Sequence, residues 1–492
     1  MTHSFLHQTD SQRWTTYTFS VVLLLAIYRL LVVQWSGIPL DLEEVYYLSW
    51  SDRLEFGYFS KPPMIAALLG LVTAWFGESA LAIKSVSIIL HSAAALVVFA
   101  LARELYDLKT AVISALAFQL MPIVGVISLF SSTDAPLIFF WALTLYAFVR
   151  AVKSPAQLRW WLLTGLFAGL GLLSKYTIGV LAIGLLFYLL SGPQRQLLRS
   201  KGLWLGLLVA ALVWLPNILW LIEHDFITLN HTKNISGIEG EVGGWSTFGE
   251  FFSSQIIVFG PIFFIGMLFW LWRPSVWSDK SSRLLLSASL PLLLLIFMQS
   301  YSSEANINWA SPAYIGLMIV AVHWMLLHAR KWLVVGISLN FLLLSGVYHY
   351  HALADLMDIQ LTRKTDPYFK RLGWEELGMA LRPMLKQHQG VSLISDNRKV
   401  LGLMAYHVAN GGERPLVRSW NPSGAWRHQY DLYNNVENYP QGEFFFLSYE
   451  PVNDAVLERF AEHESKGILR VRIYEDLQLH LYVYWVKDFQ GY

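Results

Sequence analysis

Long apolar blocks recur along this chain, and they limit its possible folds more than any other feature of the sequence. Each runs for about 17–23 residues, close to the roughly 20 that a helix needs to cross the hydrocarbon core of a bilayer. The sequence therefore predicts a polytopic α-helical membrane protein. We expect about eleven membrane-spanning helices, over residues 17–35, 80–102, 110–127, 134–150, 158–174, 176–191, 203–222, 251–272, 284–300, 310–328 and 332–350.

The composition agrees with this fold class. Of the 492 residues, 55% are hydrophobic and only 14% are charged, whereas soluble domains carry roughly 25% charged residues. The formal net charge is +1, which offers no basic surface for nucleic acid, so no nucleic-acid partner is expected. The chain has no cysteine, which excludes disulfides, thiolate metal sites and cysteine nucleophiles.

Basic residues predict the orientation of the helices, because cytoplasmic loops of membrane proteins are enriched in Lys and Arg. Alternate connections are rich in them, namely at Arg103, Lys109, Arg150, Lys153, Arg159, Arg195, Arg199, Lys201, Arg273, Lys280, Arg283, Arg330 and Lys331. The other connections hold only Arg53, Lys61, Lys175 and Lys233. We therefore expect a multi-pass protein of the cytoplasmic (inner) membrane, with its N-terminus in the cytoplasm and residues 351–492 in the periplasm.

Two segments differ from the spanning blocks. The first outward loop, residues 36–79, contains the apolar stretch 62–76, which is short and is expected to form an interfacial or re-entrant helix. Residues 351–492 mix helical patterns with strand-like runs, which predicts a small α/β domain outside the membrane. The expected helices are 374–387 and 452–463, and the expected strands are 391–395, 444–449, 469–474 and 479–486. Residues 1–350 then form the transmembrane domain.

Acidic residues cluster in the first outward loop. Asp41, Glu43 and Glu44 lie within four positions, next to Tyr46 and Tyr47. Such carboxylates at a membrane surface are suited to act as a general base or to hold a divalent cation. The alternative is a helix start, where acidic side chains stabilise the positive end of the helix dipole.

Further polar residues occur at the outward ends of later blocks. Asp134, in Ser131–Pro136, is either a second carboxylate of a site or part of a helix cap. Lys175 lies between two apolar runs, where it either reaches the interface or binds a phosphate. The same alternatives apply to Lys61 and Lys84.

Because these carboxylates and ammonium groups are all expected on one side of the membrane, together they suggest a lipid-phosphate substrate. His224 and the segment from Glu304 to Asn308 lie on that side as well, either as ligand contacts or as helix-capping and turn residues. Motifs of P-loop, dinucleotide-binding and zinc-peptidase proteins are absent from the sequence.

The order of these segments resembles a known family, the bacterial GT-C membrane glycosyltransferases of the protein-mannosyltransferase-like and aminoarabinose-transferase-like group. The resemblance covers nearly the whole chain. Its most specific part is the first loop, and the matching segments are Glu43–Ser51, Gly57–Met64, Thr133–Pro136, Gly171–Tyr176 and Asn308–Tyr314. It implies transfer of a sugar from a polyprenyl-phosphate carrier to a lipid, glycan or protein acceptor at the outer face of the membrane.

The resemblance also implies roles for individual residues. The first acid of the family's motif falls on Glu43, where the family usually has the shorter Asp. Asp41, two positions earlier, therefore remains an alternative for the base. The second acid falls on Asp134, and the phosphate-binding lysines fall on Lys61 and Lys175, with Lys84 as a third candidate. We expect substrate contacts at Glu44, Tyr46, Tyr47, Tyr58, His224, Glu304 and Asn308.

No cofactor is expected to be required, although a divalent cation that bridges the acids and the phosphate is an alternative. A polyprenyl-linked sugar flippase is the alternative function, because transporters also place charges along a membrane pathway. A non-catalytic scaffold, in which the acids and lysines are dispensable, is a third. The clustering of charges on one side and the attached outward domain favour the transferase.

Overall fold

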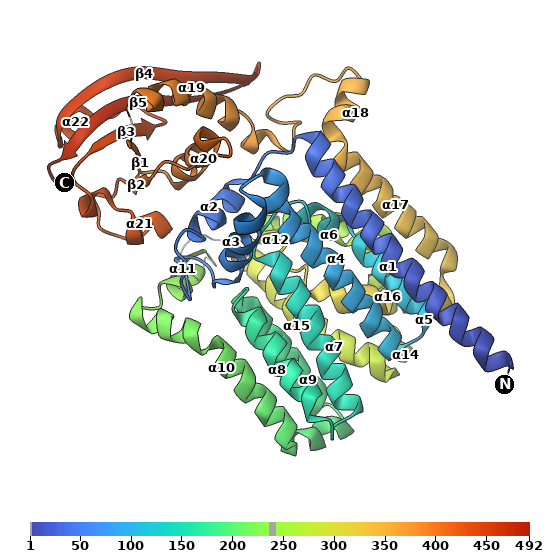
Figure 1. Cartoon of the computed structure of the whole chain (residues 1–492). Helices are drawn as coiled ribbons and strands as arrows, with labels where there is room; N and C mark the ends of the chain where they lie inside the picture. Colours follow the sequence, from blue (N-terminus) through green and yellow to red (C-terminus); the bar gives the residue numbers. More distant parts are fainter. Residues whose placement is uncertain (1, 236–242, 389) are drawn as a thin grey trace.

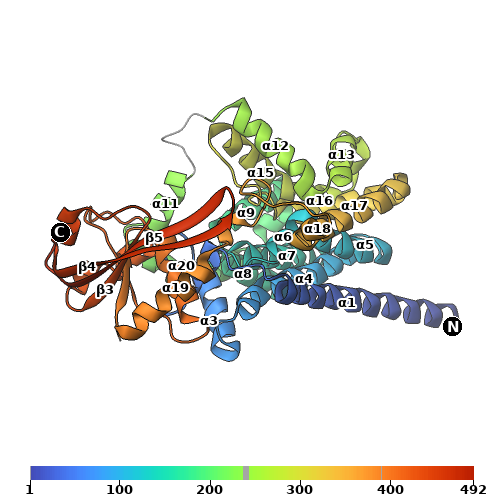
Figure 2. The same ribbon diagram turned by 90° about the horizontal axis from the view of Figure 1, so that it is seen from above.

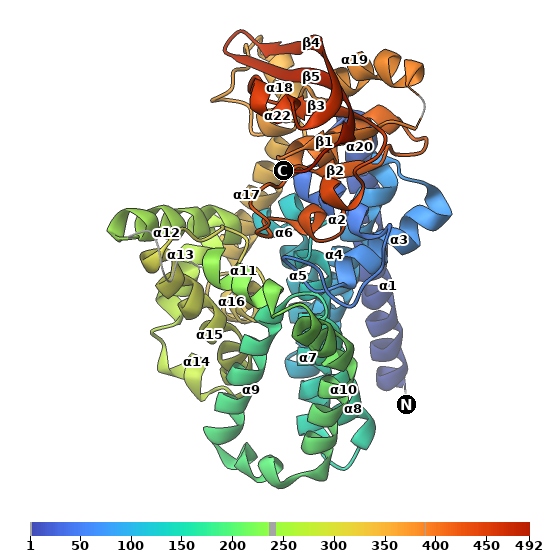
Figure 3. The same ribbon diagram turned by 90° about the vertical axis from the view of Figure 1, so that its left-hand side faces the viewer.

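The protein has a helical bundle with a mixed sheet domain at one end, as Figure 1 shows for the computed structural model. The structure describes residues 2–235, 243–388 and 390–492. The N-terminal end of the first helix lies at the end of the bundle that is remote from the sheet (Figures 1 and 3). One end of the bundle therefore carries the sheet domain, and the other carries the N-terminal end of the first helix.

Within the described residues, six helices are long and apolar enough to cross a membrane. They are α1 (Thr2–Ser36), α4 (Ala80–Leu105), α7 (Asp134–Lys153), α10 (Lys201–Glu223), α15 (Lys280–Ser302) and α17 (Arg330–Tyr348). The number rises to eight at most if two bent pairs are counted as one span each. The first pair consists of Tyr176–Leu190, which includes α9 (Gly179–Leu190), and of Pro193–Arg199. The second pair consists of α12 (Trp245–Phe259) and α13 (Pro261–Trp270).

By this measure, six to eight of the eleven expected blocks are long and apolar enough to span a membrane within the described residues. The block at 110–127 divides into α5 (Leu108–Gln119) and α6 (Pro122–Ile127), and α12 and α13 are bent by 106°. Pro122 and Pro261 occupy first turns of helices, where the missing N–H is tolerated, whereas inside a helix the ring breaks the hydrogen-bond ladder. Three other apolar helices are shorter than 18 residues, namely α3 (Met64–Phe76), α8 (Leu158–Leu172) and α16 (Ala313–His328).

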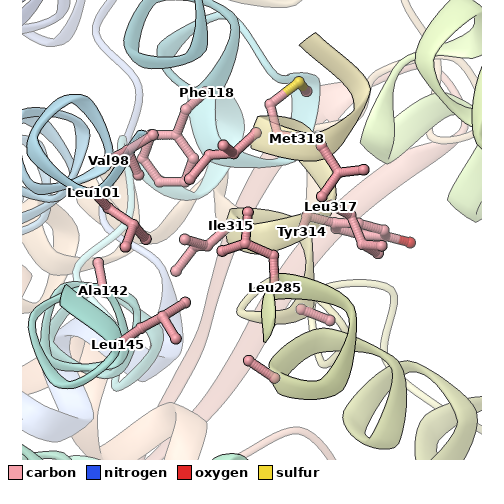
Figure 4. Packing of buried hydrophobic residues seen from close by; sticks show 14 of the residues in the cluster. Val98, Leu101, Phe118, Ala142, Leu145, Leu285, Tyr314, Ile315, Leu317 and Met318 are labelled. Atoms are coloured by element: carbon pink, nitrogen blue, oxygen red, sulfur yellow. The ribbon is translucent and has the colours of Figure 1, made fainter. Parts of the chain in front are cut away.

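The helices meet around α16, which is buried on nearly every side. Ile315 of α16 packs with Val98 and Phe118 from α4 and α5 and with Leu145 from α7, and Figure 4 shows these side chains in one contiguous cluster. A helix that is apolar all round is suited to such a central position. Four short helices complete the bundle, namely α2 (Leu42–Trp50), α11 (Ile227–Ile235), α14 (Pro274–Ser278) and α18 (Tyr350–Leu356).

The C-terminal segment forms the α/β domain that the sequence predicts. Its five-stranded sheet has the order β2-β1-β3-β5-β4, with parallel pairing of β1 to β2 and β3 and antiparallel pairing among the rest. The strands are β1 (Ser392–Ser395), β2 (Val417–Ser419), β3 (Glu443–Ser448), β4 (Phe460–Tyr474) and β5 (Leu477–Phe489). The helices are α19 (Trp374–Gln387), α20 (Arg398–Ala409), α21 (Gln429–Tyr433) and α22 (Asp454–Leu457).

The predicted helix 374–387 is confirmed as α19. The helix predicted over 452–463 is wrong after Leu457, because β4 begins at Phe460. One buried apolar cluster joins α2 and α3 to α19, α20 and the sheet, so the domain is packed onto the first loop rather than tethered beside it. Figure 3 shows the domain seated against α2 and α3, and Figure 2 shows α3 next to α19 and α20.

Candidate active site

The short helix α2 presents the acidic cluster of the first loop. Asp41 is its N-cap, and the side chain accepts a hydrogen bond from the backbone N–H of Glu43 at 3.1 Å. Glu44 reaches back to accept one from the backbone N–H of Asp41 at 2.9 Å. This reciprocal arrangement is a capping box. The two carboxylates on either side of Glu43 therefore hold the first turn of the helix.

Glu44 and Lys84 form a buried ion pair of 2.7 Å, with side chains that are 1% and 0% exposed. Glu44 also accepts a hydrogen bond from the backbone N–H of Ser131, and Lys84 donates one to the carbonyl of Leu129 at 3.1 Å. The pair thus joins α2, α4 and the segment before α7. Neither side chain has open surface for a ligand, so the structure argues against the phosphate contact predicted for Lys84 and the substrate contact predicted for Glu44.

The structure separates the two acids that the sequence leaves as alternatives. Asp41 pairs with Arg371 of the C-terminal domain at 2.8 Å. Glu43 pairs with Arg398 at 3.1 Å. Both side chains remain partly exposed, that of Glu43 at 39% and that of Arg398 at 37%. The charge of Glu43 also acts on Lys61 and favours its ammonium form, so Glu43 lies near one of the lysines that the sequence predicts to bind the phosphate.

Asp134 begins α7 and is nearly buried. One carboxylate oxygen is 2.6 Å from the ammonium of Lys175, and the other accepts a hydrogen bond from the side-chain amide of Asn308. Thr133 is the N-cap residue and makes no side-chain capping bond. The carboxylate of Asp134 therefore holds Lys175 and does not cap α7, so the helix-cap alternative for this residue is not supported.

Lys61 and Lys175 line one cavity of about 270 Å³, together with Tyr176, Trp309 and Ile296. Burial, and then the nearby charge of Lys175, lower the pKa of Lys61 to about 8. Among the described residues, we find no hydrogen bond or ion pair that engages the Lys61 ammonium. The cavity thus combines two cations with apolar and aromatic walls, as an anionic lipid headgroup requires.

The predicted tyrosines have different surroundings. Tyr47 is buried beside Glu43, and burial together with the Glu43 charge raises its pKa well above the usual value. Tyr46 is also buried, and its hydroxyl accepts a hydrogen bond from the backbone N–H of Gln429 at 2.6 Å. Tyr58 stacks on Trp50 with ring centroids 4.6 Å apart. Tyr47 is therefore near the acids, whereas Tyr46 and Tyr58 hold the loop together.

Three predicted substrate contacts remain, namely His224, Glu304 and Asn308. The structure brings only Asn308 to the site, through its hydrogen bond to Asp134. His224 stacks on Trp220 with centroids 4.0 Å apart and is the C-cap of α10. Glu304 is exposed and makes no hydrogen bond or ion pair with any residue that the structure describes. The substrate contacts predicted for His224 and Glu304 are thus not supported by their positions.

Two residues of the site escape sequence reasoning. Arg398, the first residue of α20, reaches Glu43 from 355 positions away. His231 of α11 packs against Phe59, and burial, followed by the charges of Lys61 and Arg398, lowers its pKa to about 4. No local motif marks either residue. Only the docking of the C-terminal domain and of α11 on the first loop brings them in.

The part of the chain that the structure describes has no cluster of three His, Asp or Glu side chains that could hold a metal ion. Glu43 and Asp134 are instead each paired with a protein cation. The arrangement therefore offers a partly exposed carboxylate next to a cationic cavity. Such a pair can accept a proton on one side and stabilise a departing phosphate on the other.

Comparisons with known proteins agree with this chemistry. A family model described as dolichyl-phosphate-mannose-protein mannosyltransferase matches residues 60–220, which include Lys61, Asp134 and Lys175. The lipid A galacturonosyltransferase RgtD of Rhizobium johnstonii is 30% identical over 423 residues, or 84% of this chain and 86% of that protein. The chain belongs to the protein-mannosyltransferase-like family of GT-C membrane glycosyltransferases.

Two further proteins extend the comparison. The lipopolysaccharide core galacturonosyltransferase RgtA of the same organism is 27% identical over 60% of this chain and 62% of that protein. ArnT from Cupriavidus metallidurans, solved in the apo state and bound to undecaprenyl phosphate, has the same fold: each structure has a TM-score of 0.65 at 14% identity. The apo structure covers 97% of this chain and 98% of ArnT.

The sequence prediction of the family and the reaction type is therefore confirmed. The chain is a multi-pass membrane glycosyltransferase that uses a sugar linked to a polyprenyl phosphate. The flippase alternative is abandoned, because the relatives that match are transferases.

Proposed function

We propose that the protein transfers a galacturonosyl unit from a polyprenyl-phosphate carrier to lipid A or the lipopolysaccharide core. Two relatives, a lipid A galacturonosyltransferase and a lipopolysaccharide core galacturonosyltransferase, support this choice of sugar and acceptor. The bound undecaprenyl phosphate of ArnT, which shares the fold, supports the choice of carrier. The cavity that Lys61 and Lys175 line is the observation on which the proposal depends.

The reaction takes place at the periplasmic side of the cytoplasmic membrane in this proposal. The distribution of Lys and Arg among the loops supports that side for the C-terminal domain. Glu43 lies at the end of the bundle on which that domain is packed, since Arg398 of the domain contacts it. Donor and acceptor lipids then meet the site from the outer leaflet.

Lys61 and Lys175 hold the carrier phosphate. As the bond between the anomeric carbon and the phosphate oxygen breaks, negative charge grows on the phosphate. Fixed cations beside it therefore stabilise the transition state more than the bound donor. Asp134 and Asn308 position Lys175, because one binds its ammonium and the other binds the carboxylate. We assign no direct contact with substrate to Lys84.

Glu43 is the general base. It accepts the proton of the acceptor hydroxyl while that oxygen forms the new bond to the anomeric carbon, on the face opposite the leaving phosphate. Asp41 is less suited, because it caps α2 and pairs with Arg371. The product is the glycoside with inverted configuration, and the carrier leaves as polyprenyl phosphate.

A transfer assay tests the proposal. Purified protein in lipid nanodiscs is incubated with synthetic polyprenyl-phosphate galacturonate and lipid A, and mass spectrometry detects the product. We expect galacturonosyl-lipid A from the wild type and none from Glu43→Gln. Product formed from other polyprenyl-phosphate sugars but never from the galacturonate would refute the proposed sugar. Parallel reactions with EDTA test the need for a divalent cation, and we expect no loss of activity.

A further inference from the structure

Arg398 reaches the site from the C-terminal domain. It is the first residue of α20, directly after the N-cap Asn397, so it lies at the positive end of a 12-residue helix. One guanidinium nitrogen is 3.1 Å from a Glu43 oxygen, and the guanidinium carbon lies 5.0 Å from the ring centre of Tyr46. Since both side chains of the pair are more than a third exposed, a ligand in the site can reach them.

The cations of the site come from two parts of the molecule: Lys61 and Lys175 from the bundle, and Arg398 from the C-terminal domain. Lys61 and Lys175 line the cavity whose walls include Ile296 of the spanning helix α15. A carrier tail in the membrane therefore delivers its phosphate to these lysines. The sugar extends from the phosphate away from the tail, toward the domain that supplies Arg398. The group that meets the guanidinium is thus a substituent of the sugar rather than the phosphate.

A second anion in the site has to compete with Glu43 for Arg398, because the other two cations lie beside the carrier phosphate. Lys175 is balanced by Asp134 and Arg398 by Glu43, while Lys61 has no ion-pair partner among the described residues. A carrier phosphodiester with a neutral sugar brings one negative charge, which the two lysines accommodate. A uronosyl donor brings a second negative charge, a carboxylate, and a guanidinium binds carboxylates with two parallel hydrogen bonds.

We propose that Arg398 is the residue that selects a uronosyl donor, by exchanging the carboxylate of Glu43 for the carboxylate of the sugar. This inference rests on the galacturonosyl transfer proposed above. The exchange has a consequence for catalysis, because the Glu43 oxygen that the guanidinium occupies becomes free to accept a hydrogen bond from the acceptor hydroxyl. The correct donor thereby frees the base, whereas a neutral sugar leaves Glu43 paired.

Binding measurements on the full-length protein in nanodiscs test this inference. The two probes are polyprenyl-phosphate galacturonate and polyprenyl-phosphate galactose, which differ only in carboxylate against hydroxymethyl at C6. We expect the wild type to prefer the galacturonate and Arg398→Gln to lower that preference by about 10- to 100-fold, the range for a hydrogen bond between charged groups. Arg398→Lys keeps the positive charge but cannot donate two parallel hydrogen bonds. Its preference for the galacturonate is expected to lie between those of the wild type and Arg398→Gln.

Two further variants separate selection from simple support of the fold. Glu43→Gln removes the competing carboxylate, so we expect it to bind the galacturonate more tightly although it transfers no sugar. Arg371→Gln is the matched control, because Arg371 also joins the C-terminal domain to an acid of the first loop, Asp41. It is expected to keep the wild-type ratio of the two affinities.

The outcomes are distinguishable. An equal loss of affinity for both probes in Arg398→Gln, with an unchanged ratio, overturns the selective role while the proposed transfer stands. A wild type that binds neither galacturonate nor galactose on the carrier overturns the proposed function itself. A lowered ratio in Arg398→Gln together with tighter galacturonate binding in Glu43→Gln supports the exchange of partners.

Discussion

Asp41 and Glu43 are two positions apart, and the start of α2 directs their carboxylates to different neighbours. Asp41 caps the helix and pairs with Arg371, whereas Glu43 lies within the field of Lys61 and pairs with Arg398. The sequence predicts an acid in this turn but leaves its identity open, because spacing does not show which carboxylate is used in capping. At the scale of residues, the site is therefore only partly predictable.

The first prediction concerns these two acids. Glu43→Gln should lower kcat by about 10²–10⁴, the usual contribution of a general base. Asp41→Asn should change kcat by only a few-fold, because Asn caps a helix about as well as Asp and a partly exposed ion pair contributes about 0–1 kcal/mol. Initial rates at saturating donor measure both. A loss in Asp41→Asn as large as that in Glu43→Gln would assign the base to Asp41.

The second prediction concerns pH. Burial and the nearby Lys175 lower the pKa of Lys61 to about 8, so this ammonium is charged below that pH and neutral above it. Glu43, Asp134 and Arg398 also contribute to its field. Because the carrier phosphate needs the charged form, kcat/KM for the donor should fall as the pH rises through about 8.

Lys61→Arg provides the comparison, since a guanidinium keeps its charge throughout this range. Its profile should lack the alkaline decrease, whatever its absolute rate. An alkaline decrease at the same pH in both proteins would show that another group titrates there.

At the scale of elements, the loop between α2 and α3 is held in place by close packing. Asn217 donates a hydrogen bond to the carbonyl of Phe56, and Thr228 donates one to the carbonyl of Tyr58, each at 2.6 Å. Gly57 between them faces the Trp220 ring so closely that an added Cβ would lie 2.3 Å from a ring carbon. This packing fixes the backbone that leads to Lys61.

The third prediction follows from that contact. Gly57→Ala should displace the loop and raise KM for the donor by about tenfold, one factor of ten per 1.4 kcal/mol of lost binding. Gly249→Ala in α12 is the matched control, because an added Cβ there meets nothing within 4 Å. Similar KM values in the two variants would show that the loop tolerates the extra atom and that its packing does not position Lys61.

The elements themselves follow from the sequence to different degrees. Apolar length identifies spans such as α4 and α10, but it does not reveal the bend at Gly260 and Pro261 within one apolar block. In the C-terminal domain, the amphipathic pattern predicts α19 correctly. Residues 460–463 were expected in a helix but lie in β4, because pairing with β5 outweighs local helical pattern there.

At the scale of the whole molecule, the C-terminal domain completes the site. Besides Arg398, it places Gln429 on the first loop, where the side-chain oxygen accepts a hydrogen bond from the Phe59 backbone N–H at 2.7 Å. Sequence reasoning predicts the domain from its helical and strand-like runs, and its side of the membrane from the distribution of Lys and Arg. It does not predict this contribution, because contacts between residues 355 positions apart leave no trace in local spacing.

The fourth prediction tests the arrangement across the membrane. A periplasmic reporter, alkaline phosphatase, should be active when inserted next to Asp396 and inactive when inserted next to Lys153, in the connection between α7 and α8. Green fluorescent protein at the same positions should give the opposite pattern. The same activity at both positions would contradict the proposed orientation of the bundle.

The most direct test of the account is an experimental structure with a non-cleavable donor, a polyprenyl phosphonate of galacturonate. We predict that the phosphonate lies between Lys61 and Lys175, with Glu43 next to the anomeric carbon and the sugar carboxylate on Arg398. A phosphonate bound away from both lysines, with Glu43 remote from the sugar, would contradict the claim that these groups form one catalytic site.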